Sequence, residues 1–585
     1  MNNDIASLKT LMDVVRYHAT HRPDQVAYVY LEDGESDEHP ITFRELDRQA
    51  RAFAAHLQSV VKAGDRALLL YPSGLEFIVA FLGCLYADVI AVPTTVPHLK
   101  RSTPRLLLMM KDAEAHVACT TQGVHEKIKF LAEENAEFQD IRWVISEEVD
   151  NDDAEKWSQP ESKPDNIAFL QYTSGSTSVP KGVMITNFNL FRTVQDLQIG
   201  VQFEDDSVMV SWLPIFHDMG LIFGLLTPLY VGRPCYIMSP VSFLERPFRW
   251  LNAISKHKGT HTAAPNFAYE LCVRKTTDEE KKELDLSHMV GAVNAAEPVR
   301  LETMREFTKT FTPNGFRYEM FMPGYGLAEA TVKVSNKKPG QSPAHCILDA
   351  NEIQRNKLVF VPETDPNAYP NIGCGWTSIG ADIRIVNPAT NKPCLPDEIG
   401  EIWVQSDSVA QGYWKRPEVS EEVFRARLAD SGEGPFLRTG DMGFIHNGEL
   451  YIAGRIKDMV IIQGRNYYPQ DIELTMEKCH PALRPSCGAA FAIDDGEAEH
   501  LIVVHEVRRE FRKMDNFKEV ADAIRMAVAK NHGLRVHAAV LITPSTIHKT
   551  TSGKIQRSAV REAFQGNSLE VLYEWRAPVL PGRPG

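Results

Sequence analysis

The 585-residue sequence predicts an α/β protein: a large N-terminal α/β body with several sheets and a β-rich section, followed by a small, mobile C-terminal α+β domain. Three observations predict this class. Short apolar strands alternate with helical segments up to Asn294, glycine-punctuated strands follow Gly400, and a separate group of strands with one helix follows Asp458. Because parallel strands need crossovers that cover the sheet, the first pattern predicts a parallel sheet flanked by helices.

The N-terminal elements follow from residue spacing. Apolar residues at helical spacing predict a helix that includes residues 8–15, and apolar alternation predicts a strand over residues 26–30. Thr42 is placed to cap a second helix, with Glu45 in the capping-box position. The strand, helix, strand pattern then covers residues 67–70, 77–86 and 89–92, and its strands resume at 167–170, 207–212, 234–238 and 289–294.

Composition and charge disfavour several classes of protein. The net charge of −14 disfavours nonspecific binding to nucleic acid, which needs a basic surface. The N-terminus lacks a basic segment that leads into an apolar core, so we expect no secretory signal. The longest apolar stretch, residues 77–93, contains Asp88 and is too short to span a bilayer comfortably. Nine scattered cysteines without a Cys-x-x-Cys pair indicate reduced thiols rather than a zinc site. We therefore expect a cytoplasmic protein with no nucleic-acid partner and no integral membrane segment.

The loop from Tyr172 to Gly182, YTSGSTSVPKG, is the strongest motif. It places hydroxyls, glycines and Lys181 directly after an apolar strand, which is the chemistry of a phosphate-binding loop. Pro180 stands where the Walker A motif needs its second glycine, so an ordinary P-loop NTPase is disfavoured. A flexible surface loop is the alternative, but such a loop does not need a lysine fixed behind a proline. The motif therefore predicts a nucleotide ligand.

His217, in the sequence SWLPIFHDMG, follows the end of another apolar strand and precedes a helix rich in Gly, Leu and Phe. The carboxyl ends of strands are where α/β folds bind ligands. A structural histidine at the start of a helix is the alternative. A metal site with Asp218 is disfavoured, because no second histidine lies nearby at ligand spacing.

Two further stretches, residues 294–300 (NAAEPVR) and 322–331 (MPGYGLAEAT), place small residues beside an aromatic ring or a carboxylate. Small residues let a flat base approach the backbone, and Tyr325 can stack on that base. Glu329 is a hard oxygen ligand suited to Mg²⁺. Either stretch alone is also consistent with a glycine-rich turn that carries a surface glutamate.

The C-terminal part of the sequence divides into two sections. Strands from Gly400 to Asp458 predict antiparallel β-structure, in which Asp441 either accepts both hydroxyls of a ribose or only caps a turn. We place the domain boundary at 455–458, which gives domains of residues 1–456 and 457–585. The second domain has predicted strands at 489–493, 501–507 and 538–542, a helix at 516–530, and a Ser/Gly loop that carries Lys554.

In this order, the motifs resemble the adenylate-forming superfamily of acyl-CoA synthetases, peptide-synthetase adenylation domains and luciferases, over nearly the whole chain. The stretches at 294–300, 325–331, 454–458 (GRIKD) and 466–473 (NYYPQDIE) are most similar to the fatty acyl-AMP ligases. Those enzymes make an acyl-adenylate and pass it to a carrier protein rather than to CoA. The long segment between Thr331 and Gly380 fits an insertion of that family that hinders the CoA-using closure, although an ordinary variable loop is the alternative.

The resemblance implies a role for each candidate residue. Residues expected to hold the β- and γ-phosphates are Thr173, Ser174, Gly175, Ser176, Thr177 and Lys181. Residues expected to bind the adenosine part are Ala296, Glu297, Tyr325 and Gly326 around adenine, and Asp441 with Arg455 at the ribose. Catalytic roles are implied for Lys554 as the cation of the transition state, His217 beside the acyl carboxylate, and Glu329 as the Mg²⁺ ligand. Lys457 falls at the family's hinge position, and Ser178 departs from the family, which commonly has glycine there.

The implied reaction is attack by a fatty carboxylate on the α-phosphate of ATP, with Mg²⁺, followed by transfer of the acyl group to a thiol. The implied partners are a fatty acid and an acyl carrier protein acting in trans, as in a polyketide or peptide synthase pathway. A fatty acyl-CoA synthetase remains an alternative, because it shares the adenylation residues. A non-catalytic module that binds acyl-AMP or a carrier is disfavoured by the presence of Lys181, Glu329, Asp441 and Lys554.

Overall fold

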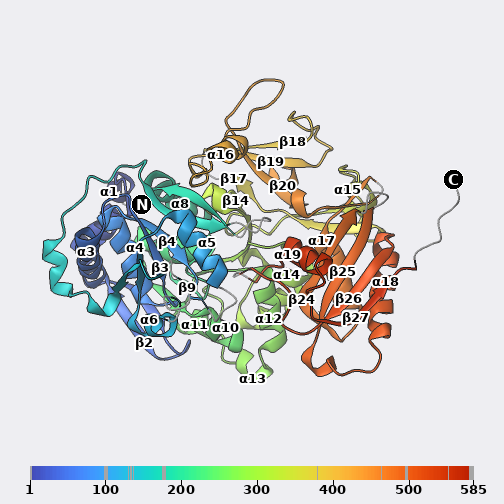
Figure 1. Cartoon of the computed structure of the whole chain (residues 1–585), viewed down its shortest axis with the longest axis horizontal. Helices are drawn as coiled ribbons and strands as arrows, with labels where there is room; N and C mark the ends of the chain where they lie inside the picture. Colours follow the sequence, from blue (N-terminus) through green and yellow to red (C-terminus); the bar gives the residue numbers. More distant parts are fainter. Residues whose placement is uncertain are drawn as a thin grey trace.

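The computed structural model describes residues 3–97, 103–129, 131, 135, 138–173, 180–377, 380–462, 464–494, 499–550 and 553–578. The fold is mixed α/β, as predicted, with a large N-terminal body and a C-terminal unit at its side (Figure 1). None of the helices in these ranges has the length and apolar character needed to cross a bilayer.

The first large sheet of the described chain has six strands and contains the predicted phosphate loop. In spatial order its strands are β6 (Arg142–Ile145), β5 (Val117–Thr120), β3 (Arg66–Leu70), β4 (Ile90–Thr94), β7 (Ile167–Thr173) and β8 (Lys181–Thr186). All neighbours are parallel except β7 and β8, which are antiparallel. Alternate residues of β3 face two different apolar cores, so both faces of the sheet are buried.

The second large sheet of the described chain has nine strands. Their spatial order is β17 (Trp376–Thr377), β14 (Ser335–Asn336), β13 (Phe321–Tyr325), β12 (Gly291–Asn294), β11 (His261–Ala264), β9 (Met209–Ser211), β10 (Cys235–Met238), β1 (Val26–Leu31) and β2 (Glu38–Thr42). The strands from β13 to β1 are parallel, which confirms the parallel sheet expected from the sequence.

Helices join and cover these sheets around one core that contains side chains of both. Thr42 and Glu45 form the predicted capping box: the Thr42 Oγ1 accepts from the Glu45 N–H at 3.3 Å, and the Glu45 carboxylate accepts from the Thr42 N–H at 2.9 Å. The helices of the body include α2 (Leu11–His21), α3 (Phe43–Val60), α4 (Leu75–Ala87), α5 (Thr103–Ala113), α8 (Asn187–Val201), α10 (Pro240–Glu245), α11 (Phe248–Lys256), α12 (Asn266–Lys275) and α14 (Leu301–Phe311).

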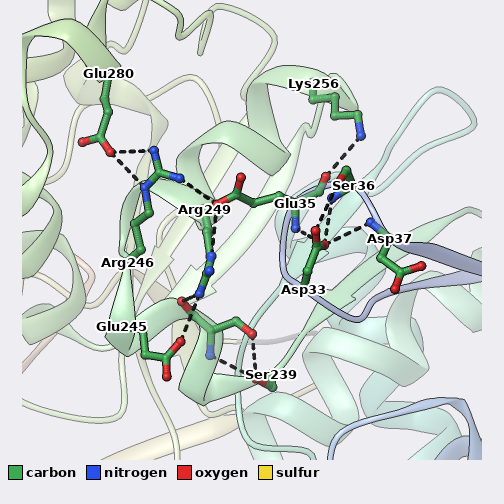
Figure 2. A network of polar contacts seen from close by, with 11 residues as sticks. Asp33, Glu35, Ser36, Asp37, Ser239, Glu245, Arg246, Arg249, Lys256 and Glu280 are labelled. Atoms are coloured by element: carbon green, nitrogen blue, oxygen red, sulfur yellow. Dashed lines mark hydrogen bonds and ion pairs between the residues drawn. The ribbon is translucent and has the colours of Figure 1, made fainter.

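A network of charged side chains fastens the loop between β1 and β2 to α10 and α11 (Figure 2). Asp33 Oδ1 accepts three backbone N–H groups of its own loop, and these bonds lower the pKa of its carboxyl. Glu35 Oε1 accepts from Arg246 at 2.8 Å and from Arg249 at 3.1 Å. The network lies on the surface of the body and holds the edge of the nine-stranded sheet in place.

The β-rich section is an antiparallel sheet of β18 (Asp382–Val386), β19 (Gly400–Gln405), β20 (Leu437–His446) and β21 (Glu449–Arg455), as expected from the sequence. Helix α16 (Pro417–Phe424) lies between β19 and β20. The segment between Thr331 and Gly380 contains a two-stranded sheet of its own, β15 (His345–Asp349) with β16 (Ala368–Ile372). This part of the chain is therefore an ordered hairpin rather than a simple loop.

The C-terminal unit has two apolar cores of its own. Its main sheet consists of β24 (Leu483–Asp494), β25 (Glu499–Val507), β26 (Val536–Ile542) and β27 (Val571–Arg576), and β22 (Val460–Ile462) pairs with β23 (Arg465–Tyr467). Its helices are α17 (Pro469–Cys479), α18 (Phe517–His532) and α19 (Arg557–Gln565). The predicted strands and helix after residue 489 all appear, within a few residues of the expected positions.

Candidate active site

The predicted phosphate loop connects β7 to β8 at the edge of the six-stranded sheet. Thr173 is the last residue of β7 and Lys181 is the first of β8, and the two are paired. The predicted ligands Ser174, Gly175, Ser176 and Thr177 lie outside the described residues, as does Ser178. The loop therefore joins two antiparallel strands, unlike the strand-to-helix turn of a Walker A motif.

Lys181 and Glu329 face the same aromatic ring. The Lys181 ammonium lies 4.9 Å from the centre of the Tyr413 ring, and the Tyr413 hydroxyl donates to Glu329 Oε1 at 2.8 Å. Burial and the charge of Lys457 lower the pKa of Lys181, and the charge of Glu329 opposes that shift. The sequence analysis missed Tyr413, and the only signal in the sequence is an aromatic residue beside Gly412 in a loop.

On the expected ribose side, Tyr325, Asp441 and Arg455 form a hydrogen-bonded group. Asp441 Oδ2 accepts from the Tyr325 hydroxyl at 2.7 Å, and Asp441 Oδ1 accepts from Arg455 Nε at 3.0 Å. The charge of Asp441 raises the pKa of Arg455, and burial together with that same charge raises the pKa of Tyr325. A carboxylate has about four acceptor positions, so Asp441 keeps capacity for ribose hydroxyls while it fixes the Tyr325 ring.

The predicted adenine side follows the end of β12. Ala296 has a φ of 71°, a left-handed conformation that non-glycine residues seldom adopt. Glu297 Oε1 accepts from the Phe267 N–H at 2.6 Å, and burial raises the pKa of this carboxyl. Gly326 is required by a close backbone approach, because a Cβ there would lie 1.7 Å from the Val332 carbonyl oxygen.

His217 lies between β9 and a π-helix at Met219–Leu226, as expected for a residue after a strand end. Its Nδ1 is 2.7 Å from Asp218 Oδ1. Burial opposes ionisation of Asp218, but His217, Lys554 and the Met219 N–H together outweigh burial and lower the pKa of the Asp218 carboxyl. The apolar side chains of this π-helix are buried in the main core.

Lys554 is presented by a tight turn of the C-terminal unit. The Lys554 carbonyl accepts from the Thr550 N–H at 2.7 Å, and the Lys554 N–H donates to Thr550 Oγ1 at 3.0 Å. Gly553 supplies the positive φ of this turn, 86°, and Ser552 lies outside the described residues.

Lys554 is an exposed residue, and its ammonium lies close enough to interact electrostatically with charged groups of the N-terminal body. The burial of its ammonium lowers the pKa of Lys554, and Arg455 adds to this shift, while Asp218, Glu297 and Asp441 oppose it. Lys554 is thus within electrostatic reach of the His217 side, the predicted adenine side and the predicted ribose side. The fold brings these sequence-distant residues into one site.

Helix α17 joins the C-terminal unit to the N-terminal body through two side-chain contacts. The Tyr369 hydroxyl, on β16, donates to Asp471 Oδ1 at 2.7 Å, and Lys478 forms an ion pair with Glu302. Within the unit, Arg557 binds both carboxylate oxygens of Glu473 at 2.7 Å. Arg557 also forms a 2.7 Å ion pair with Asp458, so the hinge segment is tied to the helix that follows Lys554.

Asp471 makes the contact between α17 and the body sensitive to pH. Burial raises its pKa to about 7, a neighbouring Glu473 adds to the shift, and Tyr369, Arg300 and Arg557 oppose it. When the contact opens, the carboxyl returns toward its usual pKa of about 3.9. The closed contact therefore binds a proton more tightly, and its stability should fall as pH rises from about 4 to about 7 and then level off.

In limited proteolysis, we expect cleavage at residues 455–458 to be faster at pH 8 than at pH 6. The Asp471→Asn variant should lose most of this difference in rate. Asp522→Asn, on the exposed side of α18, is the matched control and should behave like the unmodified protein. Equal pH dependence in Asp471→Asn and the control would contradict the assignment.

The chain belongs to the AMP-binding enzymes. Residues 15–414 match the family described as AMP-binding enzyme, which is more than half of the chain. Residues 457–574 match a second family, described as Disco-interacting protein 2-like, AMP domain.

Similar proteins define the group more narrowly. The medium-chain-fatty-acid acyl-carrier-protein ligase JamA of Moorena producens is 47% identical over 97% of both chains. The putative fatty-acid CoA ligase fadD21 of Mycobacterium tuberculosis is 36% identical, over 95% of this chain and 98% of that protein. The crystal structure of a fatty acyl-adenylate ligase from L. pneumophila, in complex with acyl adenylate and pyrophosphate, is 38% identical, with a TM-score of 0.76 and coverage of 98% and 99%. Within the AMP-binding enzymes, the chain is a fatty acyl-AMP ligase.

Proposed function

We propose that this enzyme activates a fatty acid with ATP and transfers the acyl group to the phosphopantetheine thiol of an acyl carrier protein. In the first step a carboxylate oxygen bonds to the α-phosphorus of ATP, and the bond to pyrophosphate breaks. In the second step the thiol sulfur bonds to the acyl carbon, its proton leaves, and AMP is released. The observation that carries the proposal is the position of Lys554 among Asp218, Glu297 and Asp441.

The residues of this chain act mainly through charge and placement. A carboxylate and a triphosphate repel each other, so the first step needs a cation where they meet. Lys554 supplies that cation, beside the pair of His217 and Asp218 that borders the acyl carboxylate. Lys181 and the loop before it hold the outer phosphates, and Asp441 with Arg455 holds the ribose.

Glu329 fits the role of a Mg²⁺ ligand. Mg²⁺ in nucleotide sites is usually bound by one or two carboxylates together with phosphates and water. Within the described residues the Tyr413 hydroxyl is the one donor to the Glu329 carboxylate, so Glu329 Oε2 is available for a cation. The described residues contain no cluster of three or more His, Cys, Asp or Glu side chains placed to hold a metal ion. Mg²⁺ would neutralise phosphate charge when bound.

Transfer to a carrier protein is favoured over transfer to CoA. The 47% identity to JamA, named as a carrier-protein ligase, exceeds the 36% identity to fadD21, named as a putative CoA ligase. In addition, Tyr369 of the segment between Thr331 and Gly380 holds α17 by its hydrogen bond to Asp471. Because Tyr369 belongs to the segment that is expected to hinder the CoA-using closure, this contact supports a carrier protein as the acceptor. We place the enzyme in the cytoplasm, with its carrier acting in trans.

The acceptor is tested by supplying the enzyme, ATP, Mg²⁺ and fatty acids of several chain lengths with either CoA or a carrier protein that bears phosphopantetheine. We expect acyl-carrier to form and CoA to be acylated at least about tenfold more slowly. A carrier without phosphopantetheine is the control, because it keeps the protein surface and lacks the thiol. Rapid formation of acyl-CoA would establish the CoA synthetase instead, and a folded enzyme without adenylation would indicate a binding module.

A further inference from the structure

We propose that Tyr413 is a positioning residue that holds Lys181 and Glu329 apart, so that both are available to the phosphates and the metal ion of the nucleotide. The inference rests on the proposed function, because it assigns a role within the same nucleotide site.

The side chain of Tyr413 contacts both Lys181 and Glu329. The ring of Tyr413 lies beneath the Lys181 ammonium at 4.9 Å, and its hydroxyl donates to Glu329 Oε1 at 2.8 Å. The Tyr413 residue is 7% exposed and packs edge-on against Phe424 at 5.1 Å. A rigid, buried ring thus sets the distance between a cation and a carboxylate.

The loop that carries Tyr413 is bound to the strand that begins with Lys181. The Gly412 carbonyl accepts from the Met184 N–H at 2.9 Å, and the Trp414 N–H donates to the Gly182 carbonyl at 2.7 Å. The Tyr413 N–H donates to Ser420 Oγ at 2.9 Å. These bonds fix the backbone on both sides of Tyr413 relative to the end of the phosphate loop.

The same loop also holds the segment that carries Glu329. The Ala410 N–H donates to the Glu329 carbonyl at 2.9 Å, so both the backbone and the side chain of Glu329 are bonded to residues 410–413. Residues 410–413 therefore connect the phosphate side of the site, on β8, with the predicted metal ligand, after β13.

The opposite charges of Lys181 and Glu329 explain why a residue that separates them is useful. Lys181 and Glu329 are groups of opposite charge that both contact Tyr413, yet the described residues contain no ion pair between them. A direct ion pair would have to break before Lys181 could bind phosphate and Glu329 could bind Mg²⁺. Tyr413 offers the cation a π-face and the carboxylate a hydroxyl donor, so each group is supported without neutralising the other.

Two substitutions separate the two contacts. Tyr413→Phe keeps the ring beneath Lys181 and removes the hydroxyl that orients Glu329. Because loss of a group that orients a metal ligand commonly costs about 10–100-fold in metal affinity, we expect about tenfold more Mg²⁺ to be needed for ATP binding. Tyr413→Leu removes both contacts and should also weaken ATP binding at saturating Mg²⁺.

The readout is ATP binding without a fatty acid, measured by calorimetry and by the rise in unfolding temperature across a range of Mg²⁺ concentrations. Tyr86→Phe is the matched control, since it removes a buried hydroxyl that donates to Asp47 at 2.9 Å and lies outside the site. It should leave the Mg²⁺ requirement unchanged.

An unchanged Mg²⁺ requirement in Tyr413→Phe would overturn the inference, even if Tyr413→Leu fails to fold. Unmodified enzyme that binds ATP but shows no fatty-acid-dependent release of pyrophosphate would instead refute the proposed function. The two failures are therefore distinguishable.

Discussion

Replacing Lys554 by alanine is expected to slow formation of the acyl-adenylate by about 10²–10³-fold, with little change in ATP affinity. Lys554 lies on a turn of the C-terminal unit within electrostatic reach of Asp218, Glu297 and Asp441, whereas the proposed phosphate and ribose contacts come from other residues. The variant therefore loses charge stabilisation in the transition state rather than nucleotide binding.

The measurement is single-turnover release of pyrophosphate, with ATP affinity determined separately. Lys530→Ala is the control, because it removes one positive charge from an exposed position near the end of α18. A near-normal rate for Lys554→Ala, in a folded protein, would remove Lys554 from the chemistry.

Replacing Asp441 by asparagine is expected to weaken ATP binding by about 10–100-fold, since hydrogen bonds to a charged group contribute about 1.5–3 kcal/mol. Asp441 pairs with Arg455 and accepts from Tyr325, so the change disturbs the expected ribose contact and the orientation of the Tyr325 ring. It also leaves the charge of Arg455 unpaired, and the unfolding temperature should fall.

ATP affinity of Asp441→Asn is best measured by calorimetry beside Asp430→Asn, whose exposed carboxylate bonds only to the neighbouring Ser431 N–H among the described residues. The control should match the unmodified enzyme. Unchanged affinity in Asp441→Asn would show that the ribose is held elsewhere.

Local sequence patterns correctly predicted the helices and strands that are determined by residues close together in the sequence. The capping box of Thr42 and Glu45 and the strand, helix, strand unit around α4 appear as expected, because spacing and caps act within a few residues. The antiparallel pairing of β7 with β8 was not predicted, because the motif between them specifies phosphate chemistry but not the direction of the next strand.

Some residues of the candidate site could be predicted from sequence motifs, whereas contacts between distant parts of the chain could not. Lys554, Asp441 and Glu329 stand in motifs with characteristic neighbours, and the roles of the site residues remain proposals. Tyr413 and the contact of Tyr369 with Asp471 join residues far apart in the sequence, and neither stands in a motif that specifies its partner. Only the fold brings such pairs together.

The central claim is that this chain makes an acyl-adenylate, and the exchange of labelled pyrophosphate into ATP tests it most directly. The reaction is run with unmodified enzyme and Mg²⁺, with and without a fatty acid. We predict exchange that requires both the fatty acid and the metal and that is lost with Lys554→Ala. Folded enzyme that binds ATP but shows no fatty-acid-dependent exchange would contradict the account.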